Sequence, residues 1–245
     1  MRYALYYTPG PDDALSRAAA QWLGRDPHKG VSLDQPHLSW LAEEALLTLT
    51  EDPRRYGFHA TLKAPFSLRE DRHLDELVQH LARFAEQRAP VILPSGLKVS
   101  QLGPFFALVP QGNADGLDDF ASACVRTFEP YRAPLSAADL QRRRKSQLTE
   151  AQSAYLEAWG YPYVFDAFRY HMTLTGPVPD GLQDPMRQEL TARFSEEAAA
   201  HRVIESIALF EQPARDRPFC VKHIFMLKGQ AKPAPASAAS EGIAS

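Results

Sequence analysis

The sequence predicts an α+β fold made of two similar lobes around a shared cleft. Segments with strand and helix patterns are interleaved along the chain and are roughly equal in number. No glycine-rich phosphate loop follows the first strand, which disfavours a doubly wound parallel sheet. A histidine-containing segment in the first half of the chain recurs in the second half. A repeat at this distance favours two lobes that each supply one copy to a common site.

Aromatic or aliphatic runs mark the expected strands, and apolar residues at three- and four-residue spacing mark the helices. Asp12 is a plausible N-cap of the first helix, and Gly24 lies past its end. In chain order we expect a strand over 2–8, a helix over 12–24, a strand within 55–65, a helix over 71–87, two strands within 91–111, a helix over 115–131, one or two helices within 136–160, a strand around residue 171, a helix over 184–202, and strands over 202–213 and 218–228.

The composition changes after Lys228. The final segment, GQAKPAPASAASEGIAS, consists mostly of Ala, Pro, Ser and Gly and has almost nothing to bury. Such a segment cannot offset the entropy lost on ordering, so we expect a disordered tail. The predicted organisation is therefore a single bilobal domain over 1–228 and a tail over 229–245.

Bulk properties narrow the class of protein. The chain has 245 residues and a formal net charge of −3, which argues against strong non-specific binding to nucleic acid. The two cysteines, Cys124 and Cys220, form no CxxC pair and are expected to be reduced thiols. No apolar run approaches the ~20 residues that a membrane helix needs. We expect a cytoplasmic, monomeric protein with no membrane partner.

The strongest signal is the repeat itself. RRYGFHATLKAPF (54–66) aligns with AFRYHMTLTGPV (167–178), and the two histidines are 112 positions apart (171 − 59). The aligned pairs are His59 with His171, Thr61 with Thr173, Leu62 with Leu174, and Pro65 with Pro177. A single histidine in a strand is more often structural than catalytic, but two copies of the same pattern favour a shared functional cleft.

Strand alternation predicts which side chains face that cleft, because successive residues point to opposite faces of a sheet. In both copies one face is apolar and the other carries the histidine and the threonine. Tyr56 falls on the apolar face, and we therefore exclude it from the site. The predicted cleft residues are His59, Thr61, Lys63, Arg169, His171, Thr173 and Thr175.

Two facing imidazoles suit acid–base chemistry on a phosphoester. A neutral histidine accepts a proton and a protonated one donates to a leaving oxygen near neutral pH. The threonine hydroxyls and Lys63 could hold a phosphoryl oxygen where negative charge develops. Neither histidine lies in an HxH or HExxH motif or beside a carboxylate cluster. We therefore expect no metal or other cofactor.

The paired HATL and HMTL segments resemble the signature of the two-histidine (2H) phosphoesterase superfamily, which includes LigT-like proteins. The longer segments YGFHATLKAPF and FRYHMTLTGPV resemble a bacterial branch associated with phosphonate metabolism. The resemblance implies two antiparallel-sheet lobes flanked by helices. It also implies that His59 and His171 are the acid–base pair and that Thr61 and Thr173 bind phosphate.

On this basis we expect a hydrolase, a cyclic phosphodiesterase acting on a small sugar phosphate or nucleotide. An RNA end is a rival substrate. The alternative from another class is a non-catalytic module that binds nucleotides or RNA ends in the same cleft. The assignment of acid and base to the two histidines stays open.

Two further features have a structural and a functional interpretation. The basic run QRRRKSQ (141–147) is more typical of a solvated helix face, but one of its arginines could reach the cleft and bind a second phosphate. Phe105, Phe106, Tyr161 and Tyr163 could stack a base, although packing is the more common role of such residues.

Overall fold

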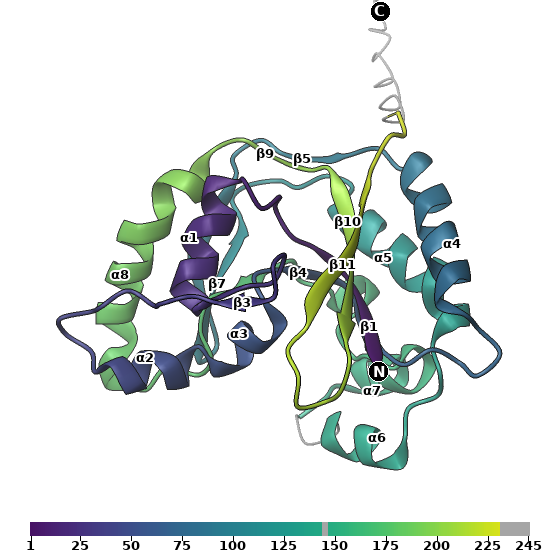
Figure 1. Ribbon diagram of the computed structural model, residues 1–245, viewed down its shortest axis with the longest axis horizontal. Helices are drawn as coiled ribbons and strands as arrows, with labels where there is room; N and C mark the ends of the chain where they lie inside the picture. Colours follow the sequence, from purple (N-terminus) through teal and green to yellow (C-terminus); the bar gives the residue numbers. More distant parts are fainter. Residues whose placement is uncertain (144–146, 231–245) are drawn as a thin grey trace, which may run out of the picture.

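A seven-stranded sheet forms the centre of the molecule in the computed structural model, which describes residues 1–143 and 147–230 (Figure 1). The strand order is β11-β10-β1-β4-β8-β7-β6, and every neighbouring pair is antiparallel. The strands are β1 (Arg2–Tyr7), β4 (Ala60–Phe66), β6 (Leu97–Leu102), β7 (Phe105–Pro110), β8 (Met172–Thr173), β10 (Ser206–Gln212) and β11 (Cys220–Met226). The predicted α+β class with antiparallel strands is confirmed.

The sheet divides into two halves where the repeated segments meet. β4 and β8 pair through a single residue pair, Ala60 with Met172. One lobe therefore contains β11, β10, β1 and β4, and the other contains β8, β7 and β6. Two small sheets lie outside: β2 (Arg25–Asp26) pairs with β3 (Val31–Ser32), and β5 (Val91–Leu93) pairs with β9 (Arg202–Ile204). The two HxT segments, residues 59–61 and 171–173, thus lie next to each other at the junction of the lobes.

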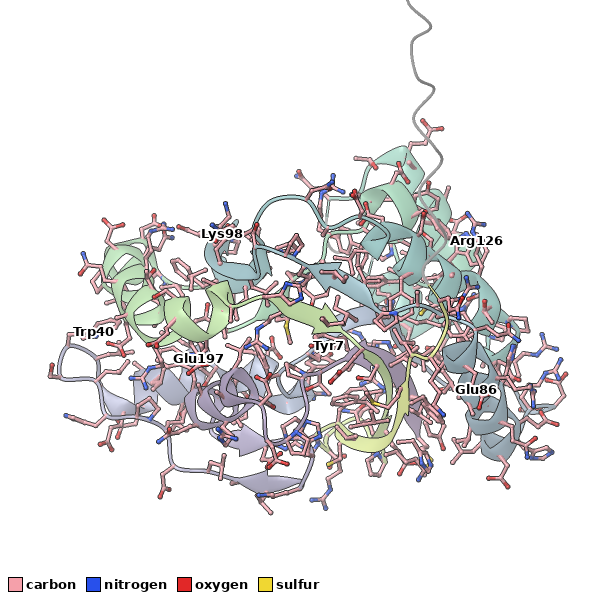
Figure 2. The ribbon with its side chains drawn as sticks, turned by 90° about the horizontal axis from the view of Figure 1, so that it is seen from above. Tyr7, Trp40, Glu86, Lys98, Arg126 and Glu197 are labelled. Atoms are coloured by element: carbon pink, nitrogen blue, oxygen red, sulfur yellow. The ribbon has the colours of Figure 1, made fainter. Side chains whose placement is uncertain are left out.

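Helices cover the two lobes separately. α8 packs on β6 and on α1, whereas α5 packs on β4 and α4 packs on β11. Figure 2 shows Glu197, on α8, and Glu86, on α4, on opposite sides of the molecule. The helices are α1 (Ala14–Leu23), α2 (Glu43–Leu49), α3 (Glu51–Tyr56), α4 (Leu74–Glu86), α5 (Leu117–Phe128), α6 (Ala137–Arg143), α7 (Glu150–Trp159) and α8 (Asp180–Ala199), with short 3-10 turns η1 (Glu129–Tyr131) and η2 (Phe165–Ala167).

Helix α1 links the chain's N-terminal segment to the second HxT segment. Asp13, rather than the predicted Asp12, caps the helix by accepting bonds from the backbone N–H groups of Leu15 and Ser16. The fully buried Trp22 donates its indole N–H to the carbonyl oxygen of Leu174, at 2.9 Å. Burying a side chain of this size stabilises the fold by roughly 2–3 kcal/mol. The bond fixes the segment that follows Thr173.

Three differences from the predicted elements matter for the site. The strand expected within 55–65 begins only at Ala60, because α3 extends through Tyr56 and Gly57 ends it. Residues 91–111 form three strands instead of two, since Pro94 and Gly96 interrupt the first run. The predicted disordered tail lies outside the described residues from 231 onward, and Gly229 still donates its N–H to the carbonyl oxygen of Arg88. Over the described ranges, no helix has the length and apolar character needed to cross a membrane.

Candidate active site

Both HxT segments line one cavity of about 340 Å³ at the junction of the lobes. This volume is in the range of small-molecule sites. His59, Thr61, His171 and Thr173 all contribute to its wall. The other lining residues are Arg2, Tyr6, Tyr56, Ala64, Pro65, Arg142, Arg143 and Tyr161. The structure therefore brings together the four residues that form the repeated motif.

The two histidines are held in the same way. The Nδ1 atom of His59 lies 2.8 Å from the carbonyl oxygen of Gly57, and Nδ1 of His171 lies 2.7 Å from that of Arg169. Each acceptor is the carbonyl two residues before its histidine. A carbonyl oxygen only accepts, so Nδ1 carries the proton in both rings. The Nε2 atom of each neutral ring is then the basic nitrogen that can exchange a proton with a ligand.

The surroundings of the two histidines differ. His59 stacks on the ring of Tyr6, with centroids 3.8 Å apart, and the hydroxyl of Thr61 donates to its Nε2 at 3.3 Å. The nearest aromatic ring to His171 belongs to Phe105, at 6.0 Å. Burial lowers the pKa of His59 to about 4, and the charge of His171 acts in the same direction. His59 is therefore neutral at physiological pH.

The backbone around the first histidine is fixed by a glycine and a threonine. Gly57 has φ +79°, and a Cβ there would lie 2.5 Å from the Cβ of Pro27. The buried Thr8 donates its hydroxyl to the carbonyl oxygen of Phe58 at 2.8 Å. These contacts orient the Gly57 carbonyl that accepts from His59, so the local turn determines the direction of the imidazole.

The rest of the cavity wall is cationic and phenolic. It holds Arg2, Arg142 and Arg143, and no Asp or Glu among the described residues lines it. Burial raises the pKa of Tyr161 to about 12 and raises the pKa of Tyr6 well above its usual range, so both phenols remain protonated donors. The described residues contain no cluster of three or more His, Cys, Asp or Glu side chains that could hold a metal ion. The wall thus offers hydrogen-bond donors and positive charge to an anion.

Lys63 does not reach the cavity, contrary to the prediction from strand alternation. Leu5 pairs with Lys63 and the next residue, Tyr6, pairs with Thr61. The two pairs are thus one residue apart in β1 but two residues apart in β4, so β4 contains a bulge. The bulge turns Lys63 toward α5. Its ammonium donates to Glu129 Oε2 at 2.7 Å, and the side chain is only 4% exposed. The residue has a structural ion pair.

Thr175 and Arg169 also lie away from the cavity. β8 ends at Thr173, so the alternation does not continue to Thr175, which is fully buried and accepts the Phe106 N–H at 3.0 Å. The exposed Arg169 donates to the carbonyl oxygens of Asp166 and Phe168. Its side chain lines a neighbouring cavity together with His171.

That neighbouring cavity, of about 440 Å³, is mainly apolar and aromatic. It shares Thr61, Ala64, Tyr161 and His171 with the histidine cavity. The sequence allowed either packing or ligand stacking for Phe105, Phe106 and Tyr163. Phe105 and Tyr163 line this cavity, whereas Phe106 is buried in the core. The polar cavity therefore continues into an apolar one.

Six of the lining residues could not be assigned to the site from the repeat. They come from β1, α3, α6 and the loop after α7, and they are Arg2, Tyr6, Tyr56, Arg142, Arg143 and Tyr161. Tyr56 was excluded by strand alternation, but it lies on a helix, where that rule does not apply. The dense basic run was the one sequence signal for Arg143.

The fold and the cavity together define an α+β protein with a paired histidine–threonine site between two lobes. The chain belongs to the DUF1045 family, described as "Protein of unknown function (DUF1045)", whose sequence model matches residues 61–220. A solved structure of the protein TT0787 from Thermus thermophilus covers 94% of this chain and 100% of its own, with 15% identity and a TM-score of 0.47.

Two curated relatives carry the name "Ribose 1,5-bisphosphate phosphokinase PhnN". The protein from Janthinobacterium sp. (strain Marseille) is 41% identical over 174 residues, which are 71% of this chain and 38% of the relative. The protein from Laribacter hongkongensis (strain HLHK9) is 29% identical over 219 residues, which are 89% of this chain and 50% of the relative. The chain thus spans half or less of the length of either relative.

These names overturn the enzyme class predicted from the sequence. The expectation was a hydrolase of the cyclic phosphodiesterase type, whereas both relatives are named as a kinase. The HxT resemblance favoured hydrolysis because paired histidines serve that reaction well. They also serve other reactions that move a proton to or from a phosphoester oxygen, so the motif alone does not determine the reaction.

Proposed function

We propose that the cleft binds a phosphorylated ribose and carries out acid–base chemistry at one of its phosphoester oxygens. The observation that carries this proposal is the matched pair of histidines, each with Nδ1 bound to the carbonyl two residues upstream and both lining one cavity. The choice of a ribose phosphate as the ligand rests on the name of the two relatives. The resemblance to the two-histidine superfamily adds the roles of the residues and a link to phosphonate metabolism.

In this proposal His59 and His171 exchange protons with the ligand through Nε2. His59 is neutral at pH 7 because burial lowers its pKa to about 4, which suits a proton acceptor. As Nε2 of His59 takes the proton of an attacking hydroxyl and the new P–O bond forms, the more open His171 protonates the phosphoester oxygen whose bond to phosphorus breaks. The hydroxyls of Thr61 and Thr173 hold the phosphoryl oxygens between the two rings. No step in this scheme requires a metal ion.

Phosphorus NMR with a panel of phosphoesters tests the proposal. The panel contains ribose mono- and bisphosphates and cyclic phosphates of ribose and of nucleosides, each with EDTA present. We expect one member to be converted by the wild type and by the control His201→Gln, which changes an exposed residue outside the cavity. We expect His59→Gln and His171→Gln to lose at least a hundredfold in rate.

Three outcomes would contradict this proposal. Turnover that disappears in EDTA and returns with a divalent ion would show that the metal-free mechanism is wrong. Saturable binding without any product would instead support the alternative of a binding module for nucleotides or RNA ends. Unchanged rates in both histidine variants would remove the pair from the reaction.

A further inference from the structure

Two of the three cavity arginines have no carboxylate partner among the residues that the structure describes. Arg2 donates from Nε to the neutral amide oxygen of Gln212 at 2.8 Å. Arg143 donates to the backbone carbonyls of Gly160 and Pro65. Arg142, by contrast, forms an ion pair with Asp139. The cavity therefore contains two uncompensated positive charges.

Keeping these two guanidinium groups charged inside the cavity costs free energy. Burial lowers the pKa of both Arg2 and Arg143, which shows that each guanidinium has lost part of its hydration. The neighbouring charges of Arg215 and Arg55 also lower the pKa of Arg2. A guanidinium does not release its proton in proteins, so it cannot relieve this cost by becoming neutral. A bound anion would offset it.

The two arginines are placed close to the catalytic histidine rather than on a distant face. The phenol of Tyr6 lies within electrostatic range of both Arg2 and Arg143, and its ring stacks directly on His59. Arg143 also lies over the ring of Tyr161, at 5.6 Å from its centroid. The arginine end and the histidine end are thus two parts of one cavity.

We propose that Arg2 and Arg143 form a second phosphate subsite, so that the ligand of this cleft carries two phosphate groups. One phosphate lies between the HxT segments, as in the proposed function on which this inference rests, and a terminal phosphate monoester lies against the two arginines. A phosphate monoester carries about −1.5 to −2 charges at pH 7, which matches the two guanidinium charges. The substrate class is therefore a sugar bisphosphate rather than a monophosphate.

Calorimetric titration with ribose 1-phosphate and with ribose 1,5-bisphosphate tests the subsite, because the 1-phosphate lacks the terminal C5 phosphate that the two arginines would hold. The wild type is expected to bind the bisphosphate at least tenfold more tightly than the monophosphate. Arg143→Gln and Arg2→Gln, tested separately, should each reduce bisphosphate affinity about tenfold, which is the usual contribution of one charge-assisted hydrogen bond. Monophosphate affinity should stay within about twofold. The control Arg83→Gln, on the exposed side of α4, should change neither affinity.

Equal loss of affinity for both ligands, or equal wild-type affinities, would overturn the subsite. Thermal unfolding of each variant shows whether it folds, and two variants in separate elements keep the test valid if one does not. The assay measures binding alone. A missing product in the NMR panel therefore counts against the proposed chemistry, whereas a missing preference for two phosphates counts against the arginine subsite.

Discussion

Acid should destabilise this protein in part through His59. In the unfolded chain the imidazole titrates near 6.5, whereas in the folded protein burial lowers its pKa to about 4. The folded state therefore binds fewer protons than the unfolded state between these values. Above pH 6.5 the ring is neutral in both states and does not change the free energy of unfolding. As the pH falls from 6.5 toward 4, the ring takes up a proton in the unfolded state only, and the free energy of unfolding decreases progressively.

The size of the effect follows from the two pKa values. At about 1.4 kcal/mol per pKa unit, the difference sets a limit of about 3 kcal/mol. Between pH 7 and pH 5 the linkage relation gives a loss of about 2 kcal/mol in the free energy of unfolding. His59→Gln removes the titrating group and should remove this part of the pH dependence.

Urea unfolding at pH 7 and pH 5 measures the effect in the wild type, in His59→Gln and in the exposed control His201→Gln. We expect the wild type and the control to lose about 2 kcal/mol more than His59→Gln between the two pH values. An NMR titration of the His59 ring should have its midpoint near 4. A midpoint near 6.5, or the same loss in all three proteins, would refute the reasoning.

Three substitutions test other parts of the structure. Gly57→Ala should rotate the carbonyl that holds His59 and reduce turnover at least tenfold while the fold persists; unchanged kcat would contradict that positioning role. Lys63→Met should lower the free energy of unfolding in urea by about 1.5–3 kcal/mol, because Glu129 and the Val125 carbonyl lose a charged donor while Arg132 still pairs with Glu129; phosphate affinity should be unchanged in calorimetry, and weaker binding would show that this lysine contributes to the site. Thr175→Val should destabilise the fold by about 1–3 kcal/mol, since it leaves a buried backbone N–H without an acceptor, and no loss would contradict the bond.

The sequence predicted the centre of the site because the site is built from a repeat. Short-range patterns locate His59 and Thr61, and the second copy shows that they belong to a pair. The same alternation failed at Lys63, because a bulge in β4 depends on pairing with β1, a strand distant in sequence. Tyr56 was missed for a similar reason: the helix that carries it has only six residues and leaves no clear periodicity.

Arginine placement could not be read from the sequence. Arg2 begins the first strand, and only the pairing of β1 with β4 brings it beside the HxT segment. Arg143 belongs to a basic run that is typical of an exposed helix face. Its side chain instead turns toward Tyr161 and the carbonyl of Gly160. Both contacts join segments that no local pattern connects, so tertiary packing alone determines them.

The packing of α1 has a consequence for how the protein unfolds. α1 follows β1, a strand of the first lobe, yet it packs on α8 and bonds through Trp22 to Leu174 in the second. The C-terminal strands β10 and β11 return to the first lobe. The chain therefore exchanges segments between lobes at both ends, and neither lobe is a continuous stretch of sequence. The two lobes should melt as one cooperative unit, so cutting the chain between the two HxT segments yields no half that folds alone.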